Sequence, residues 1–267
     1  MKNSSFALRM PFLLYIFVIG IMPLKGQVSS NDSIYKENVY RSSECRRAMD
    51  AINSYMPYTA IEIIENLQKK YKLNNLECGV LSLAYNKTHA YDKTIELYKN
   101  AALPSVSDSC YNTFLLSYIK ALSKTKDYRE AIALRERAII SLEKRDTYLD
   151  KAMLAELYFD MADDYISMED FDIWRKWMDE AVITRMKAIK ADIREVAKGE
   201  IVDKDLASFF ARYYVNMLLS NPTDKENDLY LALSAACGNV KAVDYFHQTG
   251  KSYKRILRRF IKKNKLD

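Results

Sequence analysis

The chain contains few of the residues that interrupt regular structure. Its 267 residues include only six glycines and five prolines, a share well below the ~12% that these two types make up in average proteins. Folds built from many short strands need glycine and proline at their frequent turns, whereas long helices do not. The composition therefore argues against strand-rich architectures and predicts an all-α fold.

Histidine is scarcer still, because His89 and His247 are the only two in the chain. The sequence contains no zinc-protease, serine-triad or deaminase signature and no glycine-rich phosphate loop. His89 follows Lys87-Thr88 in a predicted turn, where exposure to solvent is the ordinary state. We therefore expect a protein that is not an enzyme, uses no cofactor and binds no metal ion.

The cysteines are few and widely separated. Cys45, Cys78 and Cys110 are 33 and 32 residues apart, and Cys237 lies far along the chain. An oxidising compartment would permit disulfides. Equivalent positions on stacked helices, however, lie ~8–10 Å apart, beyond the ~7 Å that a disulfide can span between α-carbons. Buried free thiols are the favoured interpretation, and a disulfide remains the alternative.

Residues 1–26 have the pattern of a secretory signal peptide. Lys2 and Arg9 make a basic start, an apolar run extends from 12 to 22, and Gly26 is a small residue suited to cleavage. The run is shorter than the ~20 apolar residues that span a bilayer, so an uncleaved membrane anchor is the weaker alternative. We expect cleavage near Gly26 and a periplasmic or secreted mature protein.

The formal net charge of +6 is concentrated at the end of the chain. Residues 251–267 contain eight basic residues and only one acidic residue, Asp267, whereas residues 27–250 contain more acidic than basic residues. A nucleic-acid-binding protein would spread basic residues over a face of its fold. We therefore expect no nucleic-acid partner.

The basic tail has the spacing of an amphipathic helix. Its apolar residues fall on one side, and its basic residues fall on the other. One interpretation is a helix at 251–267 that caps the preceding unit, and a compatible alternative is peripheral contact with an anionic membrane surface. The basic residues concerned are Lys254, Arg255, Arg258, Arg259, Lys262 and Lys263.

Two segments share a spacing of large and small residues that resembles the tetratricopeptide repeat, a helical hairpin of ~34 residues. Residues 75–101 contain Cys78, Leu81, Ser82, Tyr85, Thr94, Tyr98 and Ala101, and residues 155–181 contain Tyr158, Met161, Ala162, Tyr165, Trp174, Met178 and Ala181. The resemblance implies that the small residues of the two helices meet where the helices cross. Trp174 departs from it, because a small residue is expected there.

Later segments resemble a related repeat or depart from the pattern. Residues 231–239, followed by Ala242 and Tyr245, are similar to a Sel1-like hairpin, and Gly238 and Gly250 suit the left-handed residue beyond a helix end. One long helix is expected from about 171 to 198. The resemblance implies an α-solenoid, an α-α superhelix, with tetratricopeptide-like repeats at 27–198, Sel1-like hairpins at 199–250 and the capping helix.

In the tetratricopeptide family the first helix of each hairpin lines a concave groove that binds extended peptides. By this resemblance we expect a non-catalytic scaffold that binds a protein or peptide partner. The residues projected onto the groove are Met49, Ile52, Leu83, Asn86, Lys87, Leu116, Lys120, Phe159, Asp163 and Ile166.

Two rival interpretations involve other side chains. Trp174 and Trp177 are three residues apart on one helix face, so an envelope protein that binds glycan through these rings is the leading alternative, although packing is the ordinary role of such residues. Glu156 and Asp160, with Asp163 and Asp164, share a face that would suit an acid/base pair or a calcium ion. An ordinary solvated helix surface is the favoured account of these carboxylates.

Overall fold

The computed structural model describes residues 32–101, 109–221 and 227–265. These residues are 80% helical and form 13 helices and no strand. The all-α prediction from the low glycine and proline content is therefore confirmed. The expected signal peptide and its cleavage site near Gly26 lie outside the described residues.

The chain divides into two compact units, residues 1–131 and 132–267, with the boundary inside α7. The described helices of the first unit are α2 (Asp32–Asn53), α3 (Pro57–Gln68), α4 (Asn75–Lys87), α5 (Tyr91–Asn100) and α6 (Ser109–Lys124), followed by the boundary helix α7 (Tyr128–Glu143). Those of the second unit are α8 (Tyr148–Ser167), α9 (Phe171–Ala188), α10 (Ile193–Lys198), α11 (Lys204–Ser220), α12 (Asn227–Ala236), α13 (Val240–Gln248) and α14 (Tyr253–Lys263).

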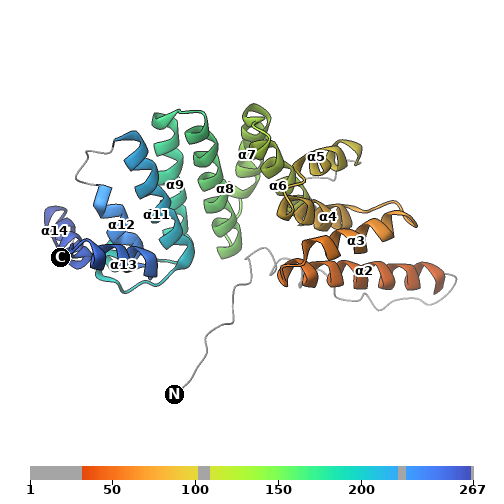
Figure 1. Ribbon diagram of the computed structural model, residues 1–267, viewed down its shortest axis with the longest axis horizontal. Coiled ribbons are helices and arrows are strands. Elements are labelled where there is room, and N and C mark those ends of the chain that lie inside the picture. Colours follow the sequence, from red (N-terminus) through yellow and green to blue (C-terminus); the bar gives the residue numbers. More distant parts are fainter. Residues whose placement is uncertain (1–31, 102–108, 222–226, 266–267) are drawn as a thin grey trace, which may run out of the picture. The chain divides into compact units, whose positions relative to one another are not determined.

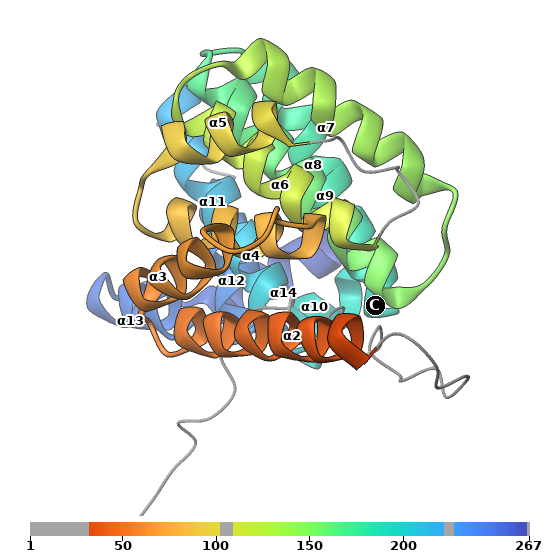
Figure 2. The same ribbon diagram turned by 90° about the vertical axis from the view of Figure 1, so that its right-hand side faces the viewer.

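Helix α4 is the centre of the first unit. It packs against α2, α3, α5 and α6 (Figure 1), and α2 and α3 lie together as the first hairpin (Figure 2). Ala48, Ile64 and Leu67 meet Leu81 and Ala84 of α4 in one apolar core, where each is at most 1% exposed. Burial of these side chains, rather than helix propensity, stabilises helices of this length.

The same turn connects the two helices of successive hairpins. Two residues before the second helix begins, the backbone adopts a positive φ, and the next N–H donates to the carbonyl five residues earlier. This is the bond that closes a helix C-terminus ending in a left-handed residue. The left-handed residues are Tyr55, His89, Lys126, Glu169 and Gly238, and the donors are Met56, Ala90, Asp127, Asp170 and Asn239, at 2.8–3.1 Å from their acceptors.

Gly238 is the one of these five turns where the sequence supplies glycine. Its φ is 96°, and a Cβ atom at this position would lie 3.1 Å from Cγ1 of Val202. Gly250 also has a positive φ, of 66°. The prediction of left-handed residues at both glycines is therefore confirmed.

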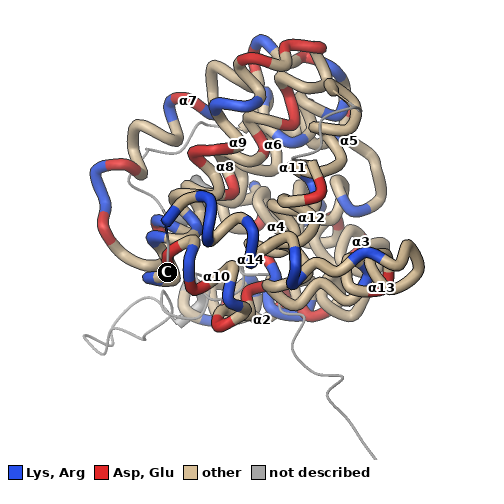
Figure 3. Tube along the Cα trace, turned by 90° about the vertical axis from the view of Figure 1, so that its left-hand side faces the viewer, with Lys and Arg blue, Asp and Glu red and all other residues tan. Residues whose placement is uncertain are grey.

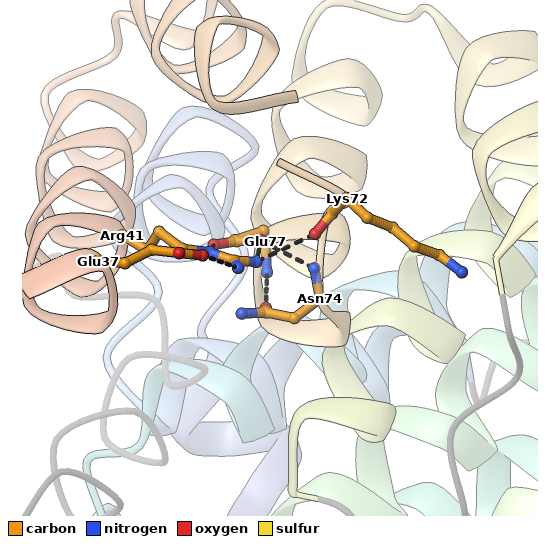
Figure 4. Close-up of polar contacts among 5 residues, drawn as sticks. All are labelled: Glu37, Arg41, Lys72, Asn74 and Glu77. Atoms are coloured by element: carbon orange, nitrogen blue, oxygen red, sulfur yellow. Dashed lines mark hydrogen bonds and ion pairs between the residues drawn. The ribbon is translucent and has the colours of Figure 1, made fainter. Parts of the chain in front are cut away.

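A network of polar contacts joins α2 to the start of α4 (Figure 4). The Arg41 guanidinium donates from Nε and Nη2 to the two carboxylate oxygens of Glu77, both at 2.7 Å. Glu77 also accepts from the backbone N–H of Asn74 at 2.8 Å, and the Asn74 side chain accepts from the Glu77 N–H at 3.0 Å. The buried Glu77 therefore both caps α4 and receives the charge-assisted bonds that attach α2.

The second unit begins with the closely packed pair α8 and α9, after which α11 packs on α9 and α12 packs on α11. α12 also contacts α13, α14 and α10. Thr147 caps α8, and its hydroxyl oxygen accepts from the N–H of Asp150 at 3.1 Å. Two arginines are buried here: Arg135 pairs with Asp164, and Arg185 pairs with Asp203 at 2.7 Å and Asp205 at 2.9 Å.

The expected long helix between 171 and 198 is wrong. α9 ends at Ala188, Lys190 adopts a φ of 55°, and α10 begins at Ile193. Asp192 and Glu195 form a reciprocal capping box at the start of α10. This acidic pair at a spacing of three is a helix-start signal that the periodicity alone concealed.

In the second hairpin, formed by α4 and α5, the small residues Ser82 and Thr94 meet. Thr94 is fully buried and donates from Oγ1 to the carbonyl of Ser82 at 3.3 Å. In the hairpin of α8 and α9, Ala162 is also fully buried, but its expected partner position holds Trp174. The Trp174 ring is only 1% exposed and meets Tyr213 of α11 edge-on at 5.4 Å, so this indole packs in the second unit's core.

Candidate functional site

The central segments of helices α4 and α6 each leave one leucine and one lysine accessible to solvent. From Cys78 to Lys87 only Leu83 and Lys87 are not buried, and from 113 to 122 only Leu116 and Lys120 are not buried. In each helix the leucine precedes the lysine by four residues, so the two side chains lie on one face, one turn apart. Because α4 packs against α6, the segments 78–87 and 113–122 together present two partly exposed leucines and two exposed lysines.

Three of the projected groove residues are core residues. Met49, Ile52 and Asn86 are each 7% exposed. Asn86 donates from Nδ2 to the carbonyl of Ser117 at 2.7 Å and accepts from Oγ1 of Thr94 at 3.0 Å, so its amide links α4 to α5 and α6. These three side chains position the surface of the first unit but do not offer contacts to a partner.

The projected residues of the second unit lie along one side of α8. Phe159, Asp163 and Ile166 are partly exposed. The Phe159 ring stacks on Phe209 of α11 with centroids 4.6 Å apart, and Asp163 pairs with Arg212 of α11 at 3.2 Å. This side of α8 is therefore partly covered by α11, and only the outer edges of these groups face solvent.

Glu156 lies on the same side of α8 and is surrounded by like charges. Desolvation and the neighbouring Asp160, Asp205 and Asp203 carboxylates raise its pKa to about 7. The Arg185 guanidinium has the opposite effect and lowers this pKa, but less strongly. The residue is more than a third exposed, and acidic side chains from α8 and the start of α11 lie near its carboxyl. Such a group exchanges a proton near neutral pH, and strongly shifted carboxyls are typical of functional sites but also of structural charge networks.

The α8 carboxylates Glu156, Asp160, Asp163 and Asp164 do not form one site. Asp164 is buried against Arg135, whereas Asp163 pairs with Arg212 and Glu156 and Asp160 remain exposed. Within the described ranges no group of three or more His, Cys, Asp or Glu side chains is arranged to hold a metal ion. The calcium interpretation therefore has no support in this geometry.

The two tryptophans do not make a paired platform for sugar. Trp174 is buried, whereas Trp177 is partly exposed, stacks on Tyr158 at 5.5 Å and has the Lys176 ammonium 5.1 Å from its ring centroid. A stacked sugar needs an open ring face. The geometry therefore does not favour glycan binding through this pair.

Buried tyrosines use their hydroxyls to join neighbouring helices. Burial, followed by a hydrogen bond to a glutamate, raises the pKa of Tyr85, Tyr118 and Tyr158 well above its usual range. Each of four tyrosines donates to a carboxylate on an adjacent helix, which explains why they are core residues. The pairs are Tyr85 with Glu65 at 2.9 Å, Tyr118 with Glu130 at 2.7 Å, Tyr158 with Glu143 at 2.7 Å and Tyr213 with Asp179 at 2.8 Å.

The cysteines that the structure describes are buried. Cys78 and Cys237 carry free thiols, and burial raises their pKa to about 11 and about 12, respectively. Cys45 is buried in the core of the first unit, and the Cys110 side chain lies outside the described residues. A thiol with a raised pKa is a poor nucleophile at neutral pH, so Cys78 and Cys237 act as apolar core residues.

Comparison with known proteins supplies no relative. No protein-family model matches the chain, and no curated protein matches it closely enough to count as one. Among the described helices, none has the length and apolar character required to cross a membrane. We therefore infer function from the side chains that α4, α6, α8 and α14 present to solvent.

Proposed function

We propose that this protein is an exported, non-catalytic scaffold of tetratricopeptide-like helical repeats that binds a segment of a protein or peptide partner. Its hairpins would stack as an α-solenoid, and the first helix of each would line the binding groove. Residues 1–26, with their basic start and apolar run, support export to the periplasm or the medium.

The repeat arrangement is supported by recurrence within each unit. The left-handed turn recurs in the hairpins that begin with α2, α4, α6, α8 and α12. In the first unit α2 packs on α4 and α4 packs on α6, whereas the second helices α3 and α5 do not pack closely on each other. When the first helices of successive hairpins lie close together and the second helices lie farther apart, the stack curves so that the first helices line its concave side.

The observation that carries the binding proposal is the repeated Leu-Lys pair of α4 and α6. Almost every other side chain of these helix segments is buried, so the partly exposed leucines and the exposed lysines are the groups that a partner could contact. Adjacent helices lie ~8–10 Å apart, which an extended peptide crosses in about three residues at ~3.3 Å each. The leucines would contact apolar side chains, and the lysines would pair with carboxylates or carbonyl oxygens of the same segment.

Site-specific photo-crosslinking in the native host tests this proposal. A benzophenone amino acid replaces Leu83 or Leu116 in turn, and the same amino acid at the exposed Lys99 of α5 is the matched control. We expect both leucine positions to give the same crosslinked protein, identified by mass spectrometry, and the control to give none. Equal crosslinking from all three positions, or none from the leucines, contradicts the proposal.

Charge reversal separates recognition from simple proximity. Replacing Lys87 and Lys120 by Glu should abolish the crosslink from Leu116, because the partner loses both cationic contacts. Reversal of Lys99 and Lys144, which are also exposed and lie outside α4 and α6, should leave it intact. Export is tested independently by the N-terminus of the mature protein, which we expect at Gln27. An intact Met1 in the membrane fraction would indicate the anchor instead.

A further inference from the structure

The apolar side of helix α14 packs against neighbouring helices. Leu257 and Ile261 are 3% and 8% exposed, and the helix packs on α10 and α12. The Tyr253 ring approaches Phe246 of α13 at 5.9 Å, and Ser252 caps the helix by accepting from the Arg255 N–H at 3.3 Å. An amphipathic helix held in this way cannot insert its apolar side into a lipid bilayer without leaving the body of the unit.

The other side of α14 consists of exposed cations. Six basic residues from 254 to 263 are exposed, and α14 contains no acidic residue (Figure 3). Lys254, Arg255, Arg258, Arg259 and Lys262 make no ion pair with any residue that the structure describes. Basic residues four apart on one helix repel each other, so these five cations concentrate positive charge on this side.

The helices that pack against α14 do not cancel that charge. On α12, Asp228 is paired with Lys251 at 2.6 Å. Around α10, Asp192 and Glu195 are engaged in their capping box and are balanced by the exposed Arg194 and Lys198. The described acidic residues of α10 and α12 therefore leave the charge of Lys254, Arg255, Arg258, Arg259 and Lys262 in place.

We propose that the basic side of α14 adsorbs to the surface of a bilayer that contains anionic lipid, while its apolar side stays packed on α10 and α12. Protein interfaces are centred on exposed apolar or aromatic anchors. On α14 the exposed side chains from Lys254 to Lys263 are all basic, whereas the apolar side chains are buried or only partly exposed. Laterally mobile headgroups, in contrast, need only charge complementarity with flexible cations along ~16 Å of helix.

This mode of attachment predicts a specific dependence on charge and salt. Each Lys or Arg near an anionic surface strengthens adsorption about fivefold, so neutralising three should weaken it about 100-fold. Screening shortens the range of the attraction to about 3–5 Å at high salt. Adsorption should therefore disappear in ~0.5 M NaCl, whereas attachment by insertion of the apolar side would persist.

Vesicle co-sedimentation of the whole protein tests the proposal. We expect binding to phosphatidylcholine vesicles with ~30% phosphatidylglycerol and none to phosphatidylcholine alone. The variant Arg255→Gln/Arg258→Gln/Arg259→Gln retains Leu257 and Ile261 and should lose about 100-fold in affinity. The control Lys99→Gln/Lys124→Gln/Lys144→Gln changes three exposed lysines and the net charge equally but should bind like the unchanged protein. Circular dichroism confirms that both variants are folded.

Each contrary outcome overturns the proposal. Equal losses in the two variants would show that net charge, not α14, attracts the protein. Binding that survives 0.5 M NaCl would show insertion. Equal affinity for a DNA duplex or for polyglutamate at the same salt concentration would show that the surface does not distinguish lipid from other polyanions.

Discussion

Glu77 places a carboxylate in the interior of the first unit, and Arg41 is the side chain that compensates it. The pair is bidentate, and the Glu77 side chain is 1% exposed. Removing one partner from a buried pair leaves an uncompensated charge, whereas a solvated pair contributes little. The chain contains both kinds, because Arg47 pairs with Glu44 at 2.6 Å while its own side chain is 64% exposed.

Arg41→Met should therefore lower the free energy of unfolding by about 3 kcal/mol. Arg47→Met, the matched control on the same helix, should change it by less than about 0.5 kcal/mol. Urea denaturation followed by circular dichroism measures both. Equal losses would show that the Arg41–Glu77 pair has no special role in attaching α2 to α4.

Glu156 makes a pH-dependent contribution to the free energy of unfolding, and the sign of this contribution follows from its raised pKa. The groups facing it are Asp160 on its own helix, Arg185 on α9, and Asp203 and Asp205 at the start of α11. Because its pKa rises from 4.5 in the unfolded chain to about 7 in the folded protein, the folded state binds the proton more tightly. Stability from this group is present below pH 4.5 and is lost as the pH rises to about 7.

Glu156→Gln should remove this loss of stability at high pH, because glutamine does not ionise. The variant should be more stable than the unchanged protein at pH 8, and the difference should shrink toward zero at pH 4.5. Urea midpoints measured at both pH values provide the comparison. A difference that is constant with pH, or that grows in acid, would contradict the raised pKa.

At the scale of helices, the hairpin turns place ordinary residues in a backbone conformation that favours glycine. Lys126 has a φ of 68° and is exposed, whereas Lys120 of the same hairpin lies within α6. A left-handed conformation costs a non-glycine residue about 1–2 kcal/mol. Within a helix, glycine is instead the unfavourable residue, by about 1 kcal/mol.

Lys126→Gly should therefore raise the free energy of unfolding by about 0.5–1 kcal/mol, while Lys120→Gly should lower it by about 1 kcal/mol. Chemical denaturation measures the two shifts in parallel. Shifts of the same sign in both variants would mean that the turn after α6 does not hold Lys126 in the left-handed region.

At the scale of the whole molecule, each unit has its own apolar core and its own buried ion pairs. The core residues contributed by α2, α3 and α4 belong to the first unit, whereas Arg135, Asp164 and Arg185 are buried in the second. In repeat proteins a perturbation acts mainly on neighbouring elements, and local opening is expressed unit by unit.

Arg41→Met should consequently accelerate amide hydrogen exchange in α2 and α4 while leaving α8, α9 and α11 close to their original rates. Exchange followed by mass spectrometry resolves these helices individually. A uniform acceleration across both units would show instead that the chain opens as one cooperative body.

The sequence by itself determined the class of structure and several of its boundaries. Scarce glycine and proline predicted the all-α fold, Pro57 begins α3, and Gly238 and Gly250 adopt the predicted left-handed conformation. These features depend on local backbone sterics and on helical periodicity, which a residue expresses whatever lies beside it. The amphipathic spacing of the tail belongs to the same category.

Only the tertiary structure decided which side chains remain available and how they are charged. Helical periodicity predicts that Met49 and Ile52 lie on one face of their helix, and their burial shows that this face packs in the core. Asn86 is buried, and its amide donates a hydrogen bond to a backbone carbonyl of α6. The pKa of Glu156 depends on carboxylates from α11, some 50 residues along the chain. Exposure and charge coupling are properties of neighbours brought together by packing, and no local pattern encodes which neighbours those will be.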